Sequence, residues 1–258
     1  MRQLTDSLTR LTAYRRLLAA IEGGACPAAL SGLSSIHRAH FAAGVHRASA
    51  RPVVLVCADE REGSRLCRDL EGFTGLPAPL LSAREFLFHP TATVSRQWEH
   101  RRLALFHAMS AGEAPLVVAT AEALLQRTIP KADFLEARFS LRMGGSYRLT
   151  DLTDRLARAG YTRCDQVEGI GQFALRGGIL DVFSPAHPSP VRVEFWGDDV
   201  DSMGLFDIRS QRRTGQLDLA MVLPAAEVLP GLAPDGVCGD LALPAAYPKL
   251  ATAADHLP

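Results

Sequence analysis

QFALRGGILDVFSPAHPSPVRVEFWGDDVDSMGLFDIRSQ, residues 172–211, is the densest pattern in this chain of 258 residues. Three short segments in it are rich in β-branched or aromatic residues, and glycine, proline or aspartate bounds each of them. These segments are Phe173 to Arg176, Ile179 to Phe183 and Val191 to Trp196. The pattern predicts an antiparallel meander of three strands.

The third segment alternates between apolar and polar residues. Side chains in a strand point to opposite faces at successive residues, so Val191, Val193 and Phe195 share a core face. Arg192 and Trp196 then lie on the outer face, and Arg176 closes the first segment. Arginine and tryptophan are enriched in protein interfaces, because they combine a large buried area with directional hydrogen bonds. The alternative interpretation is a solvated pair of arginines beside a half-buried tryptophan.

The blocks RGGILDVFSP, PVRVEFWGDDVDS and FDIRSQR in this stretch carry a resemblance to a known family. They resemble the module that the bacterial transcription-repair coupling factors (Mfd) share with the excision-repair protein UvrB. In that family the module is an inserted domain that binds UvrA through two arginines and an aromatic residue. By position in the motif, the resemblance implies UvrA contacts at Arg176, Arg192 and Trp196. The position of Trp196 is commonly phenylalanine in the family.

The composition excludes several classes of function. The chain has 28 basic and 28 acidic residues, a net charge of zero and 47% hydrophobic residues. A balanced charge does not attract a phosphate backbone over long range, so autonomous non-specific DNA binding is not expected. The five cysteines form no CxxC pair, and the eight histidines have no metal-ligand spacing, so no metal site is predicted. The sequence has no secretory segment or membrane-length apolar run, and we expect a cytoplasmic protein.

The first half of the chain alternates between strands and helices. Leu4 to Ile21 has the spacing of one amphipathic helix, and a short strand is expected at 28–30. Val53 to Cys57 and Leu116 to Thr120 are apolar runs typical of parallel strands buried on both faces, with Leu80 and Leu81 as a shorter strand. Asp59 is expected to cap the helix that follows the first of these runs. The alternation predicts a parallel α/β sheet.

Residues 32–39, GLSSIHRA, lie where a nucleotide-binding fold would place its phosphate-binding loop. The motif G-x-x-x-x-G-K-[ST] aligns Gly32 with the first glycine, His37 with the second, Arg38 with the lysine and Ala39 with the hydroxyl residue. Three of these positions are unsuitable, and no nucleotide or other cofactor is expected. The resemblance agrees, because the amino-terminal part of the coupling factors is similar to a UvrB nucleotide-binding domain that has lost its site.

The predicted fold is therefore α/β, a degenerate RecA-like or P-loop-like domain of parallel strands with a smaller inserted α+β domain. The boundaries are 127–213 for the inserted domain and 1–126 plus 214–258 for the first. The inserted domain is expected to begin with a strand at Phe139 to Arg142 and a helix capped by Thr150 or Asp151. After it, LDLAMVLPAAEVLP, residues 217–230, is expected to return one strand to the first domain.

Two further segments, residues 89–95 and 231–258, bear on whether the chain resembles UvrB or the coupling factors. UvrB inserts a long DNA-wedging β-hairpin where this chain has only the loop HPTATVS, residues 89–95, which favours the coupling factors. The tail 231–258 carries no recognisable chemistry. The family's chain continues with an RNA-polymerase-binding domain and an ATP-driven DNA translocase, so the resemblance implies an amino-terminal fragment. RNA polymerase and DNA would then be partners of parts that this sequence does not contain.

The sequence leads to the hypothesis of a non-catalytic adaptor that recruits UvrA to stalled RNA polymerase for nucleotide excision repair. The first alternative is a UvrB-like domain that processes DNA damage with a nucleotide. The second is a nucleic-acid-binding module that uses Arg209, Arg212, Arg213 and the cluster from Arg96 to Arg102. That cluster, with Glu99, His100 and Arg101, is expected to be a solvated helix face. Asp198, Asp199 and Asp201 are expected to form a hairpin turn and not a metal site.

Overall fold

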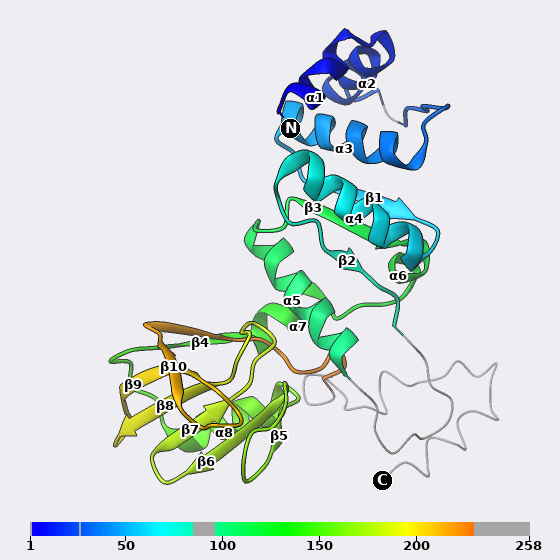
Figure 1. Ribbon diagram of the computed structural model, residues 1–258. Helices are drawn as coiled ribbons and strands as arrows, with labels where there is room; N and C mark the ends of the chain where they lie inside the picture. The colour runs from blue at the N-terminus through cyan, green and yellow to red at the C-terminus, as the bar shows by residue number, and fades with distance from the viewer. Residues whose placement is uncertain (1, 26, 85–95, 230–258) are drawn as a thin grey trace, which may run out of the picture. The chain divides into compact units, whose positions relative to one another are not determined.

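The computed structural model describes residues 2–25, 27–84 and 96–229 (Figure 1). Internal contacts divide the chain into two compact units. The first contains residues 1–98 and 105–127, and the second contains residues 99–104 and 128–258. The loop 89–95 and the tail from residue 230 lie outside the described residues, so the interpretations that rest on them remain predictions. In the described part of the chain, no helix is both long and apolar enough to cross a bilayer.

The first unit opens with helices. These are α1 (Arg2–Ser7), the 3-10 helix η1 (Leu8–Arg10), α2 (Thr12–Glu22) and α3 (Ser35–Ser49). The single helix predicted from Leu4 to Ile21 is interrupted at Leu11, where the backbone is extended with ψ of 123°. The interruption lets Leu8 and Tyr14 pack together against Phe41, whose ring meets that of Tyr14 edge to face. The strand predicted at 28–30 is absent, and these described residues have no regular structure.

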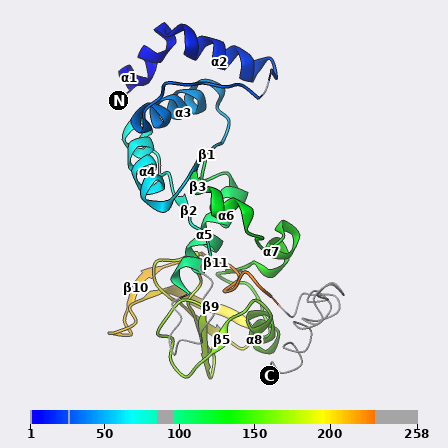
Figure 2. The ribbon, with the colours of Figure 1, turned by 90° about the vertical axis from the view of Figure 1, so that its right-hand side faces the viewer.

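A three-stranded parallel sheet forms the centre of the first unit, in the order β1 (Val53–Cys57), β3 (Leu116–Thr120) and β2 (Leu80–Leu81). Its predicted strands and parallel pairing are confirmed. Strand β3 is buried throughout, but Val54 and Val56 of β1 are half exposed. Burial of β1 on both faces was therefore a wrong prediction, because only the face of Val53, Leu55 and Cys57 packs into a core. Helix α4 (Glu60–Thr74; Figure 2) begins where expected. Asp59 caps it by accepting a hydrogen bond from the N–H of Glu62.

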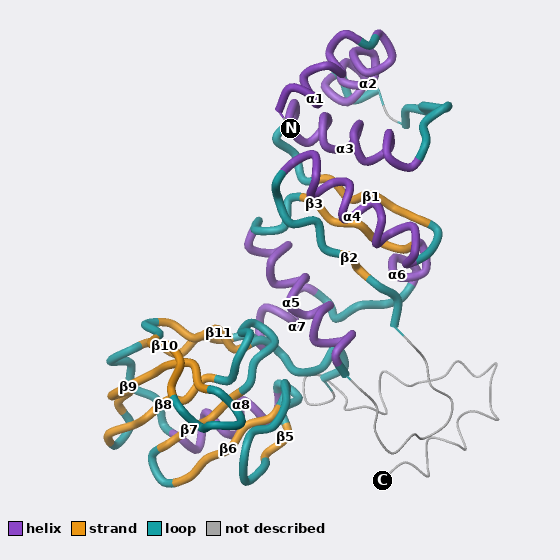
Figure 3. Tube along the Cα trace, in the orientation of Figure 1, coloured by secondary structure: helices purple, strands orange, loops and turns teal. Residues whose placement is uncertain are grey.

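The described strands of the second unit form two sheets, in which most strand pairs are antiparallel (Figure 3). The larger sheet has six strands in the order β10-β9-β8-β7-β6-β5, and all its pairs are antiparallel except β5 with β6. The strands are β5 (Thr162–Arg163), β6 (Gln172–Arg176), β7 (Ile179–Val182), β8 (Val191–Trp196), β9 (Asp199–Phe206) and β10 (Arg213–Gln216). The predicted meander is thus confirmed as β6, β7 and β8. The smaller sheet pairs β4 (Phe139–Arg142) with β11 (Leu219–Val222).

Helix α8 (Leu149–Arg158) supplies the helical side of the second core. Its Leu152 and Leu156 pack with Val191 and Val193 of β8, so the predicted core face of that strand is correct. The predicted cap at Thr150 or Asp151 is wrong. The helix begins at Leu149, and its N-cap residue Arg148 makes no side-chain capping bond. The short helices α6 (Ala121–Leu125) and α7 (Lys131–Ala137) lie in the segment that leads from β3 to β4.

The last described strand differs from expectation. Strand β11 pairs with β4 of the second unit and does not return to the first sheet, because its apolar residues Ala220 and Val222 complete the second core. Residues 99–104 of α5 (Gln97–Ala111) also belong to the second unit. There Arg102 binds Glu227 at 2.5 Å, with both side chains buried. The charged face of this helix was predicted to be solvated. That was wrong for Glu99, His100 and Arg102, which are buried.

Candidate functional site

Strand pairing brings the predicted site residues to one face of the larger sheet. Asp181 of β7 lies opposite Arg192 of β8, and Ile179 lies opposite both Arg176 of β6 and Glu194 of β8. Residues two apart in a strand share a face, so these side chains lie on the face away from the core that contains Val191 and Val193. We call Arg176, Ile179, Arg192, Glu194 and Trp196 the outer-face patch.

The two arginines of the patch converge on one carboxylate. Asp181 Oδ1 accepts from Arg192 Nε at 2.7 Å, and Asp181 Oδ2 accepts from an Arg192 terminal nitrogen at 2.8 Å. The same Oδ2 accepts from a terminal nitrogen of Arg176 at 2.9 Å. The Asp181 side chain is only 2% exposed. Two guanidinium groups therefore surround one buried carboxylate, and the cluster keeps a net charge of +1.

Arg192 is the more enclosed of the two arginines. Its guanidinium also donates to the side-chain oxygen of Gln211 at 2.8 Å and to the Gln211 carbonyl at 3.3 Å. It lies 4.3 Å from the centre of the buried Phe206 ring, a favourable cation–π distance. The hydrogen bond to Asp181 is the main cause that raises the pKa of Arg192, so this side chain stays charged. Only 18% of the side chain reaches solvent.

The other end of the patch is open. Half of the Arg176 side chain is exposed, and Trp196 is 84% exposed at the end of β8. Two glycines form the hairpin between β6 and β7. Gly177 has φ of +59°, a region that side chains other than glycine rarely adopt. A Cβ on Gly178 would lie 2.9 Å from the Phe195 carbonyl oxygen, so the turn stays close to the strand that presents Trp196.

A second charged group borders the patch. Glu194 accepts from the Ser202 hydroxyl at 2.7 Å and from Arg213 at 3.2 Å. Arg213 was a candidate for phosphate contact in the nucleic-acid alternative, and here it forms an ion pair with Glu194. Arg209 and Arg212 are exposed in the turn between β9 and β10.

The side chains of this surface can form both charged and apolar contacts. The surface offers charged N–H donors, a carboxylate and a large exposed indole, which are the groups that form hot spots between proteins. The described residues contain no group of three or more histidine, cysteine, aspartate or glutamate side chains that could hold a metal ion. Asp198 lies in the tight turn between β8 and β9, where Gly197 has φ of +65°, so the predicted hairpin is confirmed there, whereas Asp199 and Asp201 lie in β9.

The segment tested for a phosphate-binding loop has a different geometry. Gly32 has φ of +81°, but helix α3 begins at Ser35, so His37, Arg38 and Ala39 lie inside the helix and not in a loop. Arg38 forms a 2.7 Å ion pair with Glu62, and Ala39 is buried. These contacts give Arg38 and Ala39 structural roles in the packing of α3 on α4.

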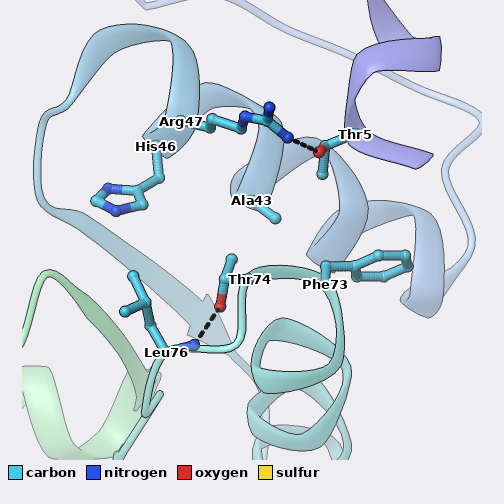
Figure 4. Close-up of a pocket in the computed structure, with 7 residues that line it drawn as sticks. All are labelled: Thr5, Ala43, His46, Arg47, Phe73, Thr74 and Leu76. Atoms are coloured by element: carbon cyan, nitrogen blue, oxygen red, sulfur yellow. Dashed lines mark hydrogen bonds between the residues drawn. The ribbon is translucent and has the colours of Figure 1, made fainter. Parts of the chain in front are cut away.

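The first unit also contains an open pocket of about 260 Å³ near the ends of α3 and α4 (Figure 4). It is lined by Thr5, Ala43, His46, Arg47, Phe73, Thr74 and Leu76. Arg47 donates to the Thr5 hydroxyl at 2.8 Å and forms an ion pair with Asp6 at 3.2 Å. Arg47 thus joins α1 to α3. The pocket lining does not include Gly32, His37, Arg38 or Ala39, the positions that were compared with the phosphate-binding motif.

Sequence reasoning missed Asp181 and Gln211 as partners of the arginines. Asp181 had a signal in the sequence, because an acidic residue between Leu180 and Val182 in a strand must find a partner when buried. Antiparallel pairing with the next strand would have offered Arg192 as that partner. Gln211 had no comparable signal, since its position opposite Arg192 depends on the path of the turn after β9.

Comparison with known proteins identifies the second unit. Residues 139–227 match the UvrB interaction domain family. The chain is 35% identical to the transcription-repair-coupling factor of Myxococcus xanthus over 206 residues, 77% of this chain and 17% of the relative. It is 26% identical to that of Bacillus subtilis over 217 residues, 84% of this chain and 18% of the relative. The UvrABC system protein B of Thermosipho africanus is 26% identical over 153 residues, 59% of this chain and 23% of the relative. The resemblance to the coupling factors and to UvrB is confirmed, and the chain spans less than a fifth of the coupling factors that it matches.

Proposed function

We propose that this chain is the adaptor region of a transcription-repair coupling factor and that its second unit binds UvrA through the outer-face patch. One observation carries the proposal. The segment that matches the UvrB interaction domain, residues 139–227, contains all five patch residues, and one of them is a tryptophan that is 84% exposed. Large exposed aromatic side chains are unfavourable in water and mark interaction sites.

The patch supplies two kinds of binding energy. Trp196 offers apolar area that a partner pocket would remove from water, and truncation of such a residue typically costs about 2–4 kcal/mol at an interface centre. Arg176 retains N–H donors that point away from Asp181, and these suit a carboxylate on the partner. Arg192 would contribute mainly through its one exposed edge, because most of its donors already have partners in the sheet.

The wider role follows from the relatives. Their name describes the coupling of repair to transcription, and we propose that this chain brings UvrA to RNA polymerase stalled at a lesion, in the cytoplasm, for nucleotide excision repair. RNA polymerase and DNA would be bound by other parts of such a protein. The first unit would be a RecA-like domain without ATPase activity, which the Arg38–Glu62 ion pair and the burial of Ala39 support.

Surface mapping tests the proposal. UvrA would be immobilised, and binding of the full chain measured by interferometry for wild type, Trp196→Ala, Arg176→Ala and Arg192→Ala. The matched control is Arg158→Ala, since Arg158 is an exposed arginine on α8 of the same unit. We expect Trp196→Ala to weaken binding by at least about 30-fold and Arg176→Ala by about tenfold.

The control variant should bind as wild type does. Equal affinities for wild type and all three patch variants, each with an unchanged circular dichroism spectrum, would mean that UvrA does not bind this face. Equal losses in the patch variants and in Arg158→Ala would point to a general charge or folding effect and would also contradict the proposal.

A further inference from the structure

We infer that Asp181 is a positioning residue of the outer-face patch, which acts by holding the Arg176 and Arg192 guanidinium groups in one fixed arrangement. The inference rests on the proposed docking function. It assigns a role to a residue that would not itself touch the partner, since the Asp181 side chain is 2% exposed.

The geometry supports a positioning role over a simple ion pair. Asp181 binds Arg192 through both of its oxygens, at 2.7 and 2.8 Å, which fixes the plane of that guanidinium relative to the sheet. Its Oδ2 then also accepts from Arg176 at 2.9 Å, so the carboxylate on β7 links a side chain of β6 to one of β8. Arg192 is further held by Gln211 and by the Phe206 ring, so Asp181 connects the half-exposed Arg176 to the enclosed Arg192.

Fixing the arginine side chains before binding affects the affinity for a partner. A free arginine side chain has many rotamers, and immobilising such a side chain at an interface costs about 0.5–1.5 kcal/mol. An arginine held in place before the encounter avoids much of that cost. Asp181 of β7 also lies between two positive groups, on β6 and β8, that would otherwise repel each other. Without its charge, Arg176 would turn away from Arg192 and lose its fixed direction.

The test uses Asp181→Asn, which keeps the shape but replaces one acceptor oxygen by a donor group that cannot bind a guanidinium. We expect the affinity of the full chain for UvrA to fall by about tenfold, the upper range for the ordering cost of one side chain. Asp154→Asn on α8 is the matched control, because it removes the same charge from an exposed site in the same unit and should leave the affinity unchanged.

A double-mutant cycle separates positioning from damage to the fold. If Asp181 acts through the two arginines, then Asp181→Asn should weaken UvrA binding by no more than about twofold when Arg176→Ala and Arg192→Ala are already present. An equal loss in both backgrounds would assign Asp181 a purely structural role and overturn the inference. Unchanged affinity of Asp181→Asn in the wild-type background would overturn it as well.

A measurement without UvrA keeps this inference distinct from the docking proposal. The Arg192 Nε–H signal in a proton–nitrogen correlation spectrum should exchange slowly with water in wild type and rapidly in Asp181→Asn. If wild type fails to bind UvrA but shows this change, the docking proposal fails and the arrangement of the arginines stands. If the Arg192 signal exchanges equally fast in both proteins, Asp181 does not hold the guanidinium and the inference is refuted.

Discussion

Replacing Arg102 with methionine should destabilise the second unit strongly. Arg102 and Glu227 form an ion pair in which the side chains are 2% and 0% exposed. Glu99 lies in the same cluster, where its carboxylate accepts the Glu227 N–H at 2.7 Å. Arg102→Met would leave two carboxylates buried with less positive charge beside them. Breaking a buried ion pair from one side costs about 3–5 kcal/mol, and we expect a value in this range.

Hydrogen exchange in increasing urea, read by mass spectrometry, can assign the loss to one unit. Peptides from β6 to β9 report the second unit, and peptides from β1 and β3 report the first. We expect Arg102→Met to lower the free energy of unfolding in the second unit, whereas Arg101→Met, at the exposed neighbouring position, should change it by less than about 0.5 kcal/mol.

A second variant tests whether the loss comes from the unpaired buried carboxylate. Removing both charges, with Arg102→Met and Glu227→Leu together, should recover most of the lost stability, since apolar replacements of a buried ion pair are often neutral. The reasoning would be refuted if Arg102→Met were no more harmful than Arg101→Met, or if the double variant were less stable than the single one.

Three further predictions concern the cores and the buried titratable groups. Leu180→Ala should cost the second unit about 2–5 kcal/mol in urea unfolding, and Ile179→Ala on the exposed face of the same strand much less; equal losses would contradict the assigned faces. Tyr161 donates to the Leu223 carbonyl at 2.7 Å, and burial raises its pKa, so its contribution to stability is complete below the unfolded-state pKa of about 10 and declines as pH rises above it. Unfolding curves between about pH 9 and pH 11 should show this decline in wild type and less of it in Tyr161→Phe, and parallel curves would refute the assignment. Burial also raises the pKa of Cys67 to about 11, so peptide mass spectrometry after alkylation near pH 8 should find it far less modified in the native chain than in urea; equal modification would show that the thiol is accessible and normally acidic.

Local patterns in the sequence predicted most of the strands correctly. The apolar runs at 53–57 and 116–120 and the alternation at 191–196 appear as β1, β3 and β8. Such patterns succeed because burial of one or both faces of a strand is determined by the residues of the strand itself. The glycine turn after Arg176 was also predictable, since few other residues adopt its backbone angles.

Features that depend on distant residues could not be predicted. Arg102 and Glu227 are 125 residues apart, and an isolated helix with charged residues gives no sign that one of its faces will be buried. The pairing of β11 with β4 is equally non-local. The strand pattern of residues 219–222 does not identify its partner strand, and the predicted return to the first sheet was therefore wrong. In the candidate site, the sequence indicated the two arginines and the tryptophan, but not the buried carboxylate that binds both arginines.

Calorimetric titration of UvrA into the full chain measures whether the outer-face patch binds UvrA, with Arg176→Ala and Trp196→Ala combined in one comparison variant. We expect saturable binding by wild type and binding at least about a hundredfold weaker by the double variant, with hydrogen exchange of β6 to β9 unchanged. Wild-type affinity retained by the double variant, or no heat of binding from the wild-type chain, would contradict the claim that this face binds UvrA.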